Sequence, residues 1–446
     1  MMSLESYVFH RRLDYDYPVI EYGKGIYLYD KNGKRYIDAA SGAAVTSIGH
    51  CFPEISETIK QLSEKITYLH GSQFTTDLME NYARDLCSLS NGLYNKVFFV
   101  SGGSEGIESA IKLARQFHCN NGNESKHKLI ARWPSYHGST IGSLSLTGKS
   151  GARKYYVPYL LDIKHINAPL CYHCPYNDSP EKCCVPCGYE LNNIINSIGS
   201  QYISAFVFEP VIGASAGVVF PPLKYFEVVS NICRDNNILL ISDEVMCGFG
   251  RIGEWFASNK FNFCPDITVM GKGISGGYVP LSAVFCNDLV YNTIKEKAGI
   301  FLHGFTFENT PFSCGIGSCI LSVMKKFNCV ENSGEMGNRL KKGLQEELSQ
   351  HKNVGDIRGI GLFCGVEVVK NKGEKLPFER NLNISEKIVT FGMSIGINLY
   401  FATGFLPNGN GDVIMFAPPL IVKSEEIDDI VEFGVKAIRE GIRDAK

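Results

Sequence analysis

Thr268-Val-Met-Gly-Lys-Gly-Ile-Ser-Gly-Gly277 places one lysine, Lys272, directly after an apolar run. The run Ile267–Met270 is typical of a buried strand, and glycines stand on both sides of the lysine. A lysine held at a strand end loses its charge readily and can act as a nucleophilic amine. The structural alternative is a lysine whose stem lies along the strand end while its ammonium reaches water.

Runs typical of strands alternate with runs typical of helices on the N-terminal side of this stretch. The expected strands are Lys96–Val100, Ala205–Phe208 and Ile238–Ser242, and the clearest expected helices are Ser104–Phe117 and Leu223–Asn236. Strands that are apolar throughout and separated by helices indicate a mostly parallel sheet in an α/β sandwich.

Both ends of the chain have a different pattern. Short strands around the turn Asn32-Gly33 indicate an N-terminal hairpin. After Phe312, helices near 318–327, 334–350, 381–395 and 424–443 surround short strands at 361–370 and 413–416. We expect a small α+β domain made of 1–60 and 316–446, and a large α/β domain at 61–315. A chain of 446 residues is long enough for this division.

Composition excludes several classes of protein. The chain is 44% hydrophobic and 20% charged, as in ordinary globular proteins. A net charge of −2 gives no reason to expect nucleic acid or an acidic membrane surface as a partner. No apolar run approaches the roughly 20 residues of a membrane span, and the N-terminus does not resemble a secretory signal. With 16 cysteines, these features predict a cytoplasmic protein.

Two further features are expected at the carboxyl ends of strands, where open α/β sheets bind their ligands. Ser101-Gly-Gly-Ser-Glu105 opens an expected helix, and its backbone N–H groups suit a phosphate, although such turns also simply cap helices. Asp243 and Glu244 end another apolar run. Buried carboxylates are costly unless a cation or a donor meets them, although Asp243 could also cap a turn.

A phosphate site, a carboxylate and an amine-bearing lysine are together what pyridoxal 5′-phosphate (PLP) requires. Lys272 would hold the aldehyde of the cofactor, and the helix after Gly103 would hold its phosphate. Asp243 would keep the pyridine nitrogen protonated, so that the ring can withdraw electrons from the substrate.

The chain resembles the class III aminotransferases of PLP fold type I over nearly all its length. The matching stretches are Asp243–Gly253, Pro265–Ile267, Gly271–Gly273, Gly276–Leu281, Ser101–Glu105, Ser135–Gly138, Phe208–Val211, His303–Thr306, Ala417–Leu420, Asp38–Gly42 and Gly49–His50. The resemblance implies a large domain around a mostly parallel sheet of seven strands, and a smaller α+β domain built from both termini.

The resemblance also implies roles for individual residues. Lys272 would form the Schiff base with PLP and carry a proton between the substrate's α-carbon and C4′ of the cofactor, and Asp243 would pair with the pyridine nitrogen. The other expected cofactor contacts are Gly103 and Ser104 at the phosphate, Val245 and Tyr136 on the two ring faces, His137, Glu209, and Thr306 from the neighbouring subunit. Plain structural roles remain the alternatives for Tyr136 and Thr306.

The implied activity is transfer of an amino group from an amine or amino acid donor to a keto acid or aldehyde acceptor. The implied assembly is a homodimer, or a tetramer, with active sites at the subunit interface. Epimerases, aminomutases, decarboxylases and phospholyases of the same class are the alternatives, because they share the cofactor residues. A catalytically silent scaffold is a further alternative, against which the intact Lys272 and Asp243 argue.

The chain departs from the family pattern in three places. Met246 stands where many members have glutamine, so it cannot donate a hydrogen bond to the ring hydroxyl of PLP. Phe307–Thr310 replaces a Ser-Gly-His or Gly-Gly-Asn run. The third departure is the segment Leu399–Asp412, which contains no arginine or lysine.

Many relatives use an arginine in this third segment to bind a substrate carboxylate. Tyr400, Phe401 and Phe405 could instead line an apolar pocket. We therefore predict an amine or ω-amino substrate in preference to a plain α-amino acid, unless a cation elsewhere in the chain replaces the arginine.

Cysteines gather in the segment 171–187. Cys171 and Cys174 form one C-x2-C pair, and Cys184 and Cys187 form another, with Cys183 and His173 beside them. This spacing is similar to a small zinc knuckle, but free thiols and disulfides remain open. No catalytic role and no metal are assigned to it.

Overall fold

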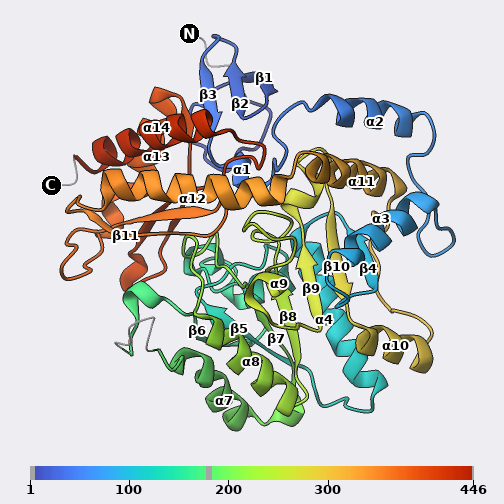
Figure 1. The fold of residues 1–446 in the computed structure, drawn as a ribbon. Helices are drawn as coiled ribbons and strands as arrows, with labels where there is room; N and C mark the ends of the chain where they lie inside the picture. Colours follow the sequence, from blue (N-terminus) through green and yellow to red (C-terminus); the bar gives the residue numbers. More distant parts are fainter. Residues whose placement is uncertain (1–5, 177–182, 444–446) are drawn as a thin grey trace.

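A seven-stranded sheet forms the centre of the large part of the molecule in the computed structural model, which describes residues 6–176 and 183–443 (Figure 1). In spatial order its strands are β4 (Lys96–Val100), β10 (Ser282–Cys286), β9 (Ile267–Met270), β8 (Leu239–Asp243), β7 (Ile203–Phe208), β5 (Lys128–Trp133) and β6 (Lys164–Asn167). Among these strands, β10 alone runs antiparallel to its neighbours, and the pairs from β9 to β6 are parallel. The predicted fold class is confirmed.

Helices bury both faces of this sheet. Along β7, Ala205 and Val207 pack on the side of α4 (Gly103–Asn120), whereas Phe206 and Phe208 pack on the side of α8 (Leu223–Asp235). Successive side chains of a strand point to opposite faces, so a strand covered on both sides must be apolar at every position. All six residues of β7 are buried accordingly.

Two four-stranded sheets form the second part of the molecule. The first contains β1 (Ile20–Lys24), β2 (Tyr27–Asp30), β3 (Arg35–Asp38) and β13 (Ile397–Asn398). The second contains β11 (Val354–Gly359), β12 (Cys364–Val368), β15 (Asp412–Phe416) and β14 (Tyr400–Thr403). Because β3 pairs in parallel with β13, the N-terminal strands lie beside the C-terminal helices, as the blue and red segments of Figure 1 show.

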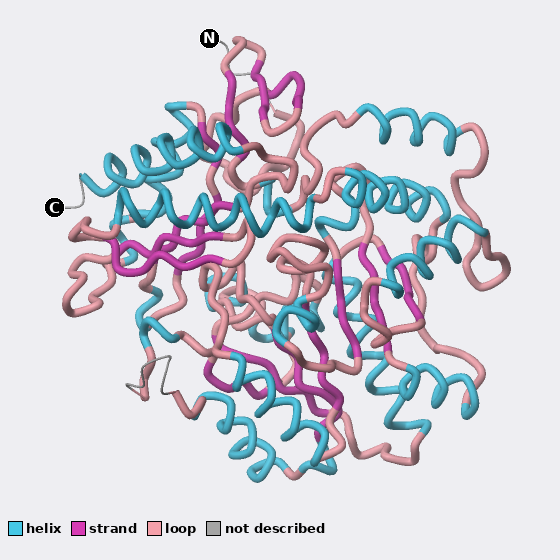
Figure 2. Tube along the Cα trace, viewed as in Figure 1, coloured by secondary structure: helices cyan, strands magenta, loops and turns pink. Residues whose placement is uncertain are grey.

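The remaining helices surround these sheets, as Figure 2 shows. They are α1 (Ser41–Ala44), α2 (Pro53–Ser63), α3 (Asp77–Ser88), α5 (Ile141–Leu146), α6 (Ser150–Arg153), α7 (Pro186–Ile198), α9 (Ala257–Phe261), α10 (Asp288–Lys297), α11 (Pro311–Lys326), α12 (Cys329–Leu348), α13 (Ile384–Ile395) and α14 (Ser424–Arg443). The short 3₁₀ turns are η1 (Val157–Tyr159), η2 (Cys171–His173), η3 (Ser200–Tyr202), η4 (Lys272–Ser275), η5 (Arg380–Leu382) and η6 (Pro407–Gly409).

The expected elements are present, with shifted bounds at several ends. The expected strand Lys96–Val100 coincides with β4, whereas the helix expected near 334–350 begins earlier, at Cys329. No strand was predicted at the positions of β1, β5, β6, β10, β11, β13 and β14. The division of the chain at residues 60 and 315 stays a prediction, and its second boundary falls within α11.

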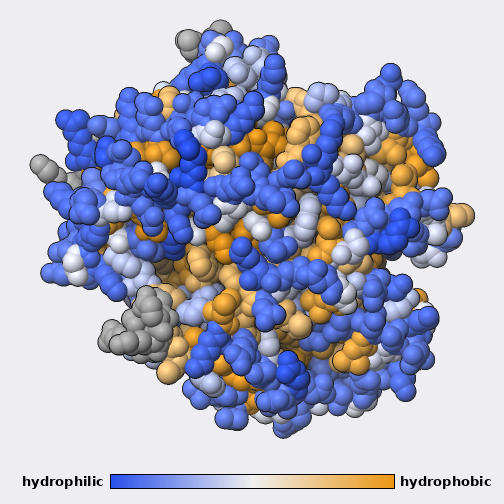
Figure 3. All heavy atoms as spheres, in the orientation of Figure 1, coloured by the Kyte–Doolittle hydropathy of each residue, from blue (hydrophilic) through white to orange (hydrophobic). Residues whose placement is uncertain are grey.

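Hydrophilic residues dominate the face of the molecule drawn in Figure 3, and apolar residues are visible between them in patches. Across residues 6–176 and 183–443, no helix combines the length and the apolar character that crossing a bilayer requires.

Candidate active site

The candidate residues gather where neighbouring strands of the large sheet end. Strand β8 ends at Asp243, and Asp243 pairs with Val269 of β9. Strand β9 ends at Met270, two residues before Lys272. Since parallel strands end at the same edge of the sheet, the carboxylate and the lysine are brought to one place.

The backbone at Lys272 is strained. Its φ is +45°, in the left-handed region that non-glycine residues rarely adopt. A Cβ added to the preceding Gly271 would lie 3.3 Å from Cγ1 of Val245, so the chain passes close to that side chain. Burial lowers the pKa of the half-buried Lys272 amine, and this effect exceeds the opposite influence of Asp243 and Glu209. A lysine with a lowered pKa supplies more of the neutral, nucleophilic amine.

Asp243 is held by a buried histidine. Its Oδ2 lies 2.8 Å from Nδ1 of His137, and the two side chains are 5% and 0% exposed. Its Oδ1 accepts a hydrogen bond from the backbone N–H of Val245 at 3.1 Å. Two fixed partners orient the carboxylate, so it can present a charge to a ligand atom without rearranging.

The neighbouring Glu244 performs a structural task instead. Its Oε2 accepts a hydrogen bond from the backbone N–H of Ala257 at 2.5 Å, and its Oε1 accepts one from Ser258 at 3.2 Å. Glu244 therefore caps the start of α9. Burial raises the pKa of Glu244 to about 7. Of two consecutive carboxylates, one faces the lysine and the other supports the fold.

Glu209 positions the aromatic residue expected on the cofactor ring. Its Oε1 accepts a hydrogen bond from the backbone N–H of Tyr136 at 2.9 Å, and its Oε2 accepts one from Gly213 at 3.3 Å. Burial raises the pKa of Glu209. The Tyr136 side chain is half-buried, and its hydroxyl lies 3.1 Å from Oγ of Ser139. Glu209 thus acts through Tyr136.

The start of α4 offers free backbone donors next to these residues. Its N-cap, Gly102, makes no side-chain cap, and the first N–H groups of a helix have no partner within the helix. A Cβ added to Gly103 would lie only 2.9 Å from Cγ1 of Val245. Ser104 Oγ accepts a hydrogen bond from the N–H of Ser139 at 3.1 Å. The glycine therefore allows the helix start to approach Val245 closely.

Thr306 is exposed on a surface loop, so the protomer by itself does not enclose it. In the segment 307–310, which departs from the family pattern, Asn309 makes specific contacts. Asn309 Oδ1 accepts a hydrogen bond from the N–H of Phe99 at 2.9 Å, and the Asn309 N–H donates to the Phe99 carbonyl at 3.0 Å. Asn309 thereby anchors the loop to strand β4.

The other two departures involve Met246 and strand β14. Met246 is buried, with its sulfur 2.3 Å from where a Cβ of Gly213 would stand. Tyr400 and Ala402 of β14 pack with the core around β7, whereas Phe401 packs with the other core, as alternation along a strand requires. Phe401 therefore does not share a face with Tyr400, contrary to the expectation of a common pocket.

Two buried or half-buried basic residues near the site were not predicted from the sequence. Arg132 is fully buried, and its guanidinium donates to the carbonyl oxygen of Glu209. Lys149 is half-buried, and its ammonium donates to the carbonyl oxygen of Ala214 at 2.9 Å. A basic residue inside the apolar run of β5 was the available signal for Arg132. No local pattern marks Lys149, because its partners come from distant segments.

The cysteine-rich segment is only partly described, since residues 177–182 lie outside the described ranges. Cys171, Cys174 and Cys187 are half-buried and Cys184 is exposed, all with free thiols. In the part of the chain that the structure describes, no group of three histidine, cysteine or carboxylate side chains is arranged to hold a metal ion.

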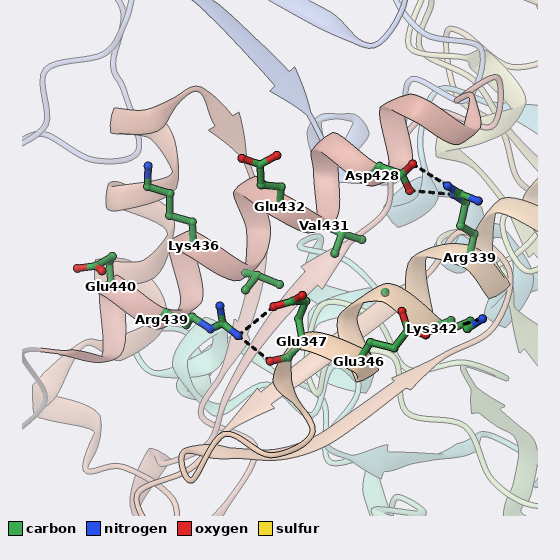
Figure 4. Close-up of a pocket in the computed structure, with 12 residues that line it drawn as sticks. Arg339, Lys342, Glu346, Glu347, Asp428, Val431, Glu432, Lys436, Arg439 and Glu440 are labelled. Atoms are coloured by element: carbon green, nitrogen blue, oxygen red, sulfur yellow. Dashed lines mark hydrogen bonds and ion pairs between the residues drawn. The ribbon is translucent and has the colours of Figure 1, made fainter.

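A cavity of about 700 Å³ between α12 and α14 is separate from this site (Figure 4). Charged side chains line it, and they pair with one another across the two helices. Arg339 lies 2.6 Å from Asp428, and Arg439 lies 3.0 Å from Glu347. None of the candidate cofactor residues lines this cavity.

Comparisons with known proteins agree over the whole chain. The family described as Aminotransferase class-III matches residues 10–438. The uncharacterized aminotransferase YodT of Bacillus subtilis is 35% identical over 96% of this chain and 96% of its own length. Gamma aminobutyrate transaminase 3, chloroplastic, of Solanum lycopersicum is 35% identical over 95% of this chain and 80% of its own. The crystal structure of the omega transaminase from Pseudomonas jessenii in complex with PMP has a TM-score of 0.89 and 32% identity, and the match covers 96% of this chain and 93% of that one.

Proposed function

Because the chain belongs to the class III aminotransferases, we propose that it binds PLP and transfers the amino group of an amine or ω-amino compound to a keto acid or aldehyde. The observation that carries this proposal is that the Asp243–His137 pair and Lys272 follow the ends of adjacent paired strands, close enough for Asp243 to act on the lysine's charge. The characterised relatives compared above are named as transaminases, which favours amino-group transfer over epimerase, aminomutase, decarboxylase or phospholyase activity.

The residues present fit the cofactor. The uncapped start of α4 supplies donors for a phosphate, and Gly103 leaves space beside Val245 that a Cβ would fill. Asp243 offers an oriented negative charge for a protonated ring nitrogen. When bound, PLP supplies an electron sink that stabilises negative charge on the substrate's α-carbon.

Each residue of the proposed site has a separate role. The Lys272 amine would hold the aldehyde of a bound PLP, and as a free amine it would carry a proton to and from the substrate's α-carbon. Asp243, held by His137, keeps the ring nitrogen protonated. Gly103 and Ser104 bind the phosphate, Val245 and Tyr136 cover the two ring faces, and Glu209 holds the Tyr136 backbone in place.

We propose a homodimer, the small domain of which comprises 1–60 and 316–446 and the large domain 61–315. Exposed apolar side chains near Thr306 support association, since contiguous exposed apolar surface is typical of interfaces. Leu302 is 77% and Phe307 61% exposed, and Phe307 packs edge-on against the 45% exposed Tyr68. We propose that this loop is buried against a partner and that Thr306 reaches the partner's phosphate site. The 16 free thiols support a reducing compartment such as the cytoplasm.

The proposal is tested by the visible absorption of the PLP-loaded protein during successive additions of an amine and a carbonyl compound. The amines are 4-aminobutyrate, benzylamine and alanine, and the carbonyl compounds are pyruvate and propanal. We expect an amine to remove the visible band and a carbonyl compound to restore it, with nitrogen recovered in the second product. Loss of the band that no carbonyl compound reverses would contradict amino-group transfer.

A further inference from the structure

The ammonium group of Lys149 has hydrogen-bond donors left over that can bind an anion. Its ammonium has three N–H donors, and one of them meets the neutral carbonyl of Ala214 at 2.9 Å. Within residues 6–176 and 183–443, no carboxylate lies within ion-pair distance of it. Burial lowers the pKa of Lys149, with Arg11 and Arg380 lowering it further and Glu209 opposing them. An unpaired, partly buried cation gains more from an anionic ligand than an exposed one does.

The segment that carries Lys149 is bonded to the turn that carries Tyr136 and His137. Thr147 Oγ1 accepts a hydrogen bond from the backbone N–H of His137 at 2.9 Å. Ser135 Oγ accepts one from the N–H of Gly148 at 3.0 Å. Ala214, the partner of Lys149, follows Gly213, which donates to Glu209. The chain beside Lys149 is therefore bonded to the turn of Tyr136 and His137, and its ammonium is bonded to the segment that contacts Glu209.

The segment without arginine shares a cavity with the two neighbours of Lys149 in the chain, although the Lys149 side chain itself does not line that cavity. Gly148 and Ser150, on either side of the lysine, line a cavity of about 420 Å³ together with Gly404, Phe405, Leu406 and Pro407. The loop where many relatives place their carboxylate-binding arginine thus faces the segment of Lys149. Burial raises the pKa of Tyr400, at the start of this loop, with Tyr136 raising it further and Arg11 lowering it.

Three arginines of this region, Arg358, Arg380 and Arg153, already have partners, whereas Arg11 is exposed near the N-terminal end of the described chain. Arg358 bonds Asp356 at 2.9 Å and Glu367 at 2.6 Å, besides two backbone carbonyls. Arg380 pairs through both terminal nitrogens with Glu386. Arg153 donates to the carbonyls of three residues. Binding a substrate carboxylate with any of them would first require breaking these bonds.

We propose that Lys149 binds the carboxylate of the substrate, in place of the arginine that the segment Leu399–Asp412 lacks. The inference rests on the proposed aminotransferase function and names a substrate class for it. That class is a carboxylate-bearing amino donor or acceptor, such as an ω-amino acid or a keto acid. One ammonium with two remaining donors suits a single carboxylate, and Lys149 then determines specificity without taking part in proton transfer.

The test compares Lys149→Gln, Lys149→Arg and Lys154→Gln in the PLP-loaded protein. Lys154 is the matched control, since it is exposed five residues further along the same segment, with its ammonium over the Tyr155 ring. The measured quantity is the ratio of kcat/KM for pyruvate to kcat/KM for propanal, which lacks the carboxylate. We expect Lys149→Gln to lower this ratio by about 10- to 100-fold, as loss of a charge-assisted hydrogen bond does. Lys149→Arg should restore much of the ratio, and Lys154→Gln should leave it unchanged.

A binding measurement supplies a second readout that needs no turnover. Isothermal titration of propionate into the PLP-loaded protein should give a dissociation constant that rises about 10-fold or more in Lys149→Gln. An unchanged ratio and an unchanged propionate affinity would overturn the inference while leaving aminotransferase activity intact. Failure of the wild-type protein to use either carbonyl compound would instead contradict the proposed function.

Discussion

The cofactor side and the substrate side of the site are built in different ways. On the cofactor side, Asp243 and Lys272 follow directly on two paired strands of one sheet. On the proposed substrate side, Lys149, Ala214 and Tyr400 come from three segments that do not pair in one sheet. A sheet fixes the distance between strand ends, so the first set needs only short motifs. The second set depends on how separate segments pack, which varies more readily.

This difference explains why the family can be recognised from short sequence motifs, whereas the substrate cannot. The residues around Asp243 and Lys272 follow directly on strands of the large sheet, so short stretches of sequence are enough to mark them. The arginine expected in 399–412 is absent, and the fold of β14 is nevertheless intact. Changes on the substrate side can therefore alter specificity without disturbing the cofactor site.

The largest effect is expected from Lys272→Ala. Removing the amine removes both the bond to the cofactor's aldehyde and the proton carrier, so kcat should fall by about 1,000-fold or more. The visible band of the lysine-bound cofactor should disappear, while far-UV circular dichroism stays that of the wild type. Retention of more than a tenth of the wild-type kcat would show that another residue performs these tasks.

The next effect compares the two consecutive carboxylates. Asp243→Asn keeps a side chain of the same shape beside His137. It removes the negative charge that keeps the ring nitrogen of PLP protonated, so kcat should fall about 100-fold or more. Glu244→Gln is the matched control, because Glu244 caps α9 and does not face the lysine. Steady-state kinetics of both variants provide the test. Equal losses in the two would remove the distinction between catalytic and structural carboxylate.

A smaller effect is expected on the substrate side. Tyr400→Ala should raise KM for benzylamine about 10-fold, because an aromatic contact facing the Tyr136 side is lost. Phe401→Ala, which alters the opposite face of β14, should lower the melting temperature and change this KM little. The reverse pattern would show that the two faces of β14 are assigned incorrectly.

The smallest effect concerns stability and pH. Burial raises the pKa of Glu244 from its ordinary value of 4.5 to about 7, so the folded protein binds this proton more tightly than the unfolded chain does. The protonated Glu244 therefore contributes up to roughly 3 kcal/mol to the free energy of unfolding. This contribution is fully present below pH 4.5 and is lost as pH rises through about 7. Urea unfolding of wild type and Glu244→Gln between pH 5 and 8 measures it. We expect the wild type to lose stability relative to the variant as pH rises, and parallel curves would contradict this.

Much of the fold and the cofactor side could be predicted from the sequence for physical reasons. Strands covered on both faces must be apolar throughout, which made β4, β7 and β8 visible. Glycine-flanked Lys272 and the consecutive carboxylates are rare in such positions. The sequence could not show that Asp243 belongs to the site and that Glu244 caps α9, because this depends on the direction of each side chain after the strand ends.

The rest could not be predicted, because it depends on contacts between distant segments. Strand β3 pairs with β13 after more than half the chain intervenes. Phe401 was expected in a pocket that its place in the β14 alternation excludes. Lys149 carries no local signal, since only packing brings it to Ala214. Expectations for Thr306 depend on a second subunit and stay predictions.

The most direct test of the account identifies the lysine that bonds the cofactor. The PLP-loaded protein is reduced with borohydride, digested with a protease and analysed by mass spectrometry, so that the peptide carrying the reduced cofactor can be sequenced. We predict that the label lies on Lys272 and is lost in Lys272→Ala. Label on another lysine, including Lys149, would contradict the central assignment.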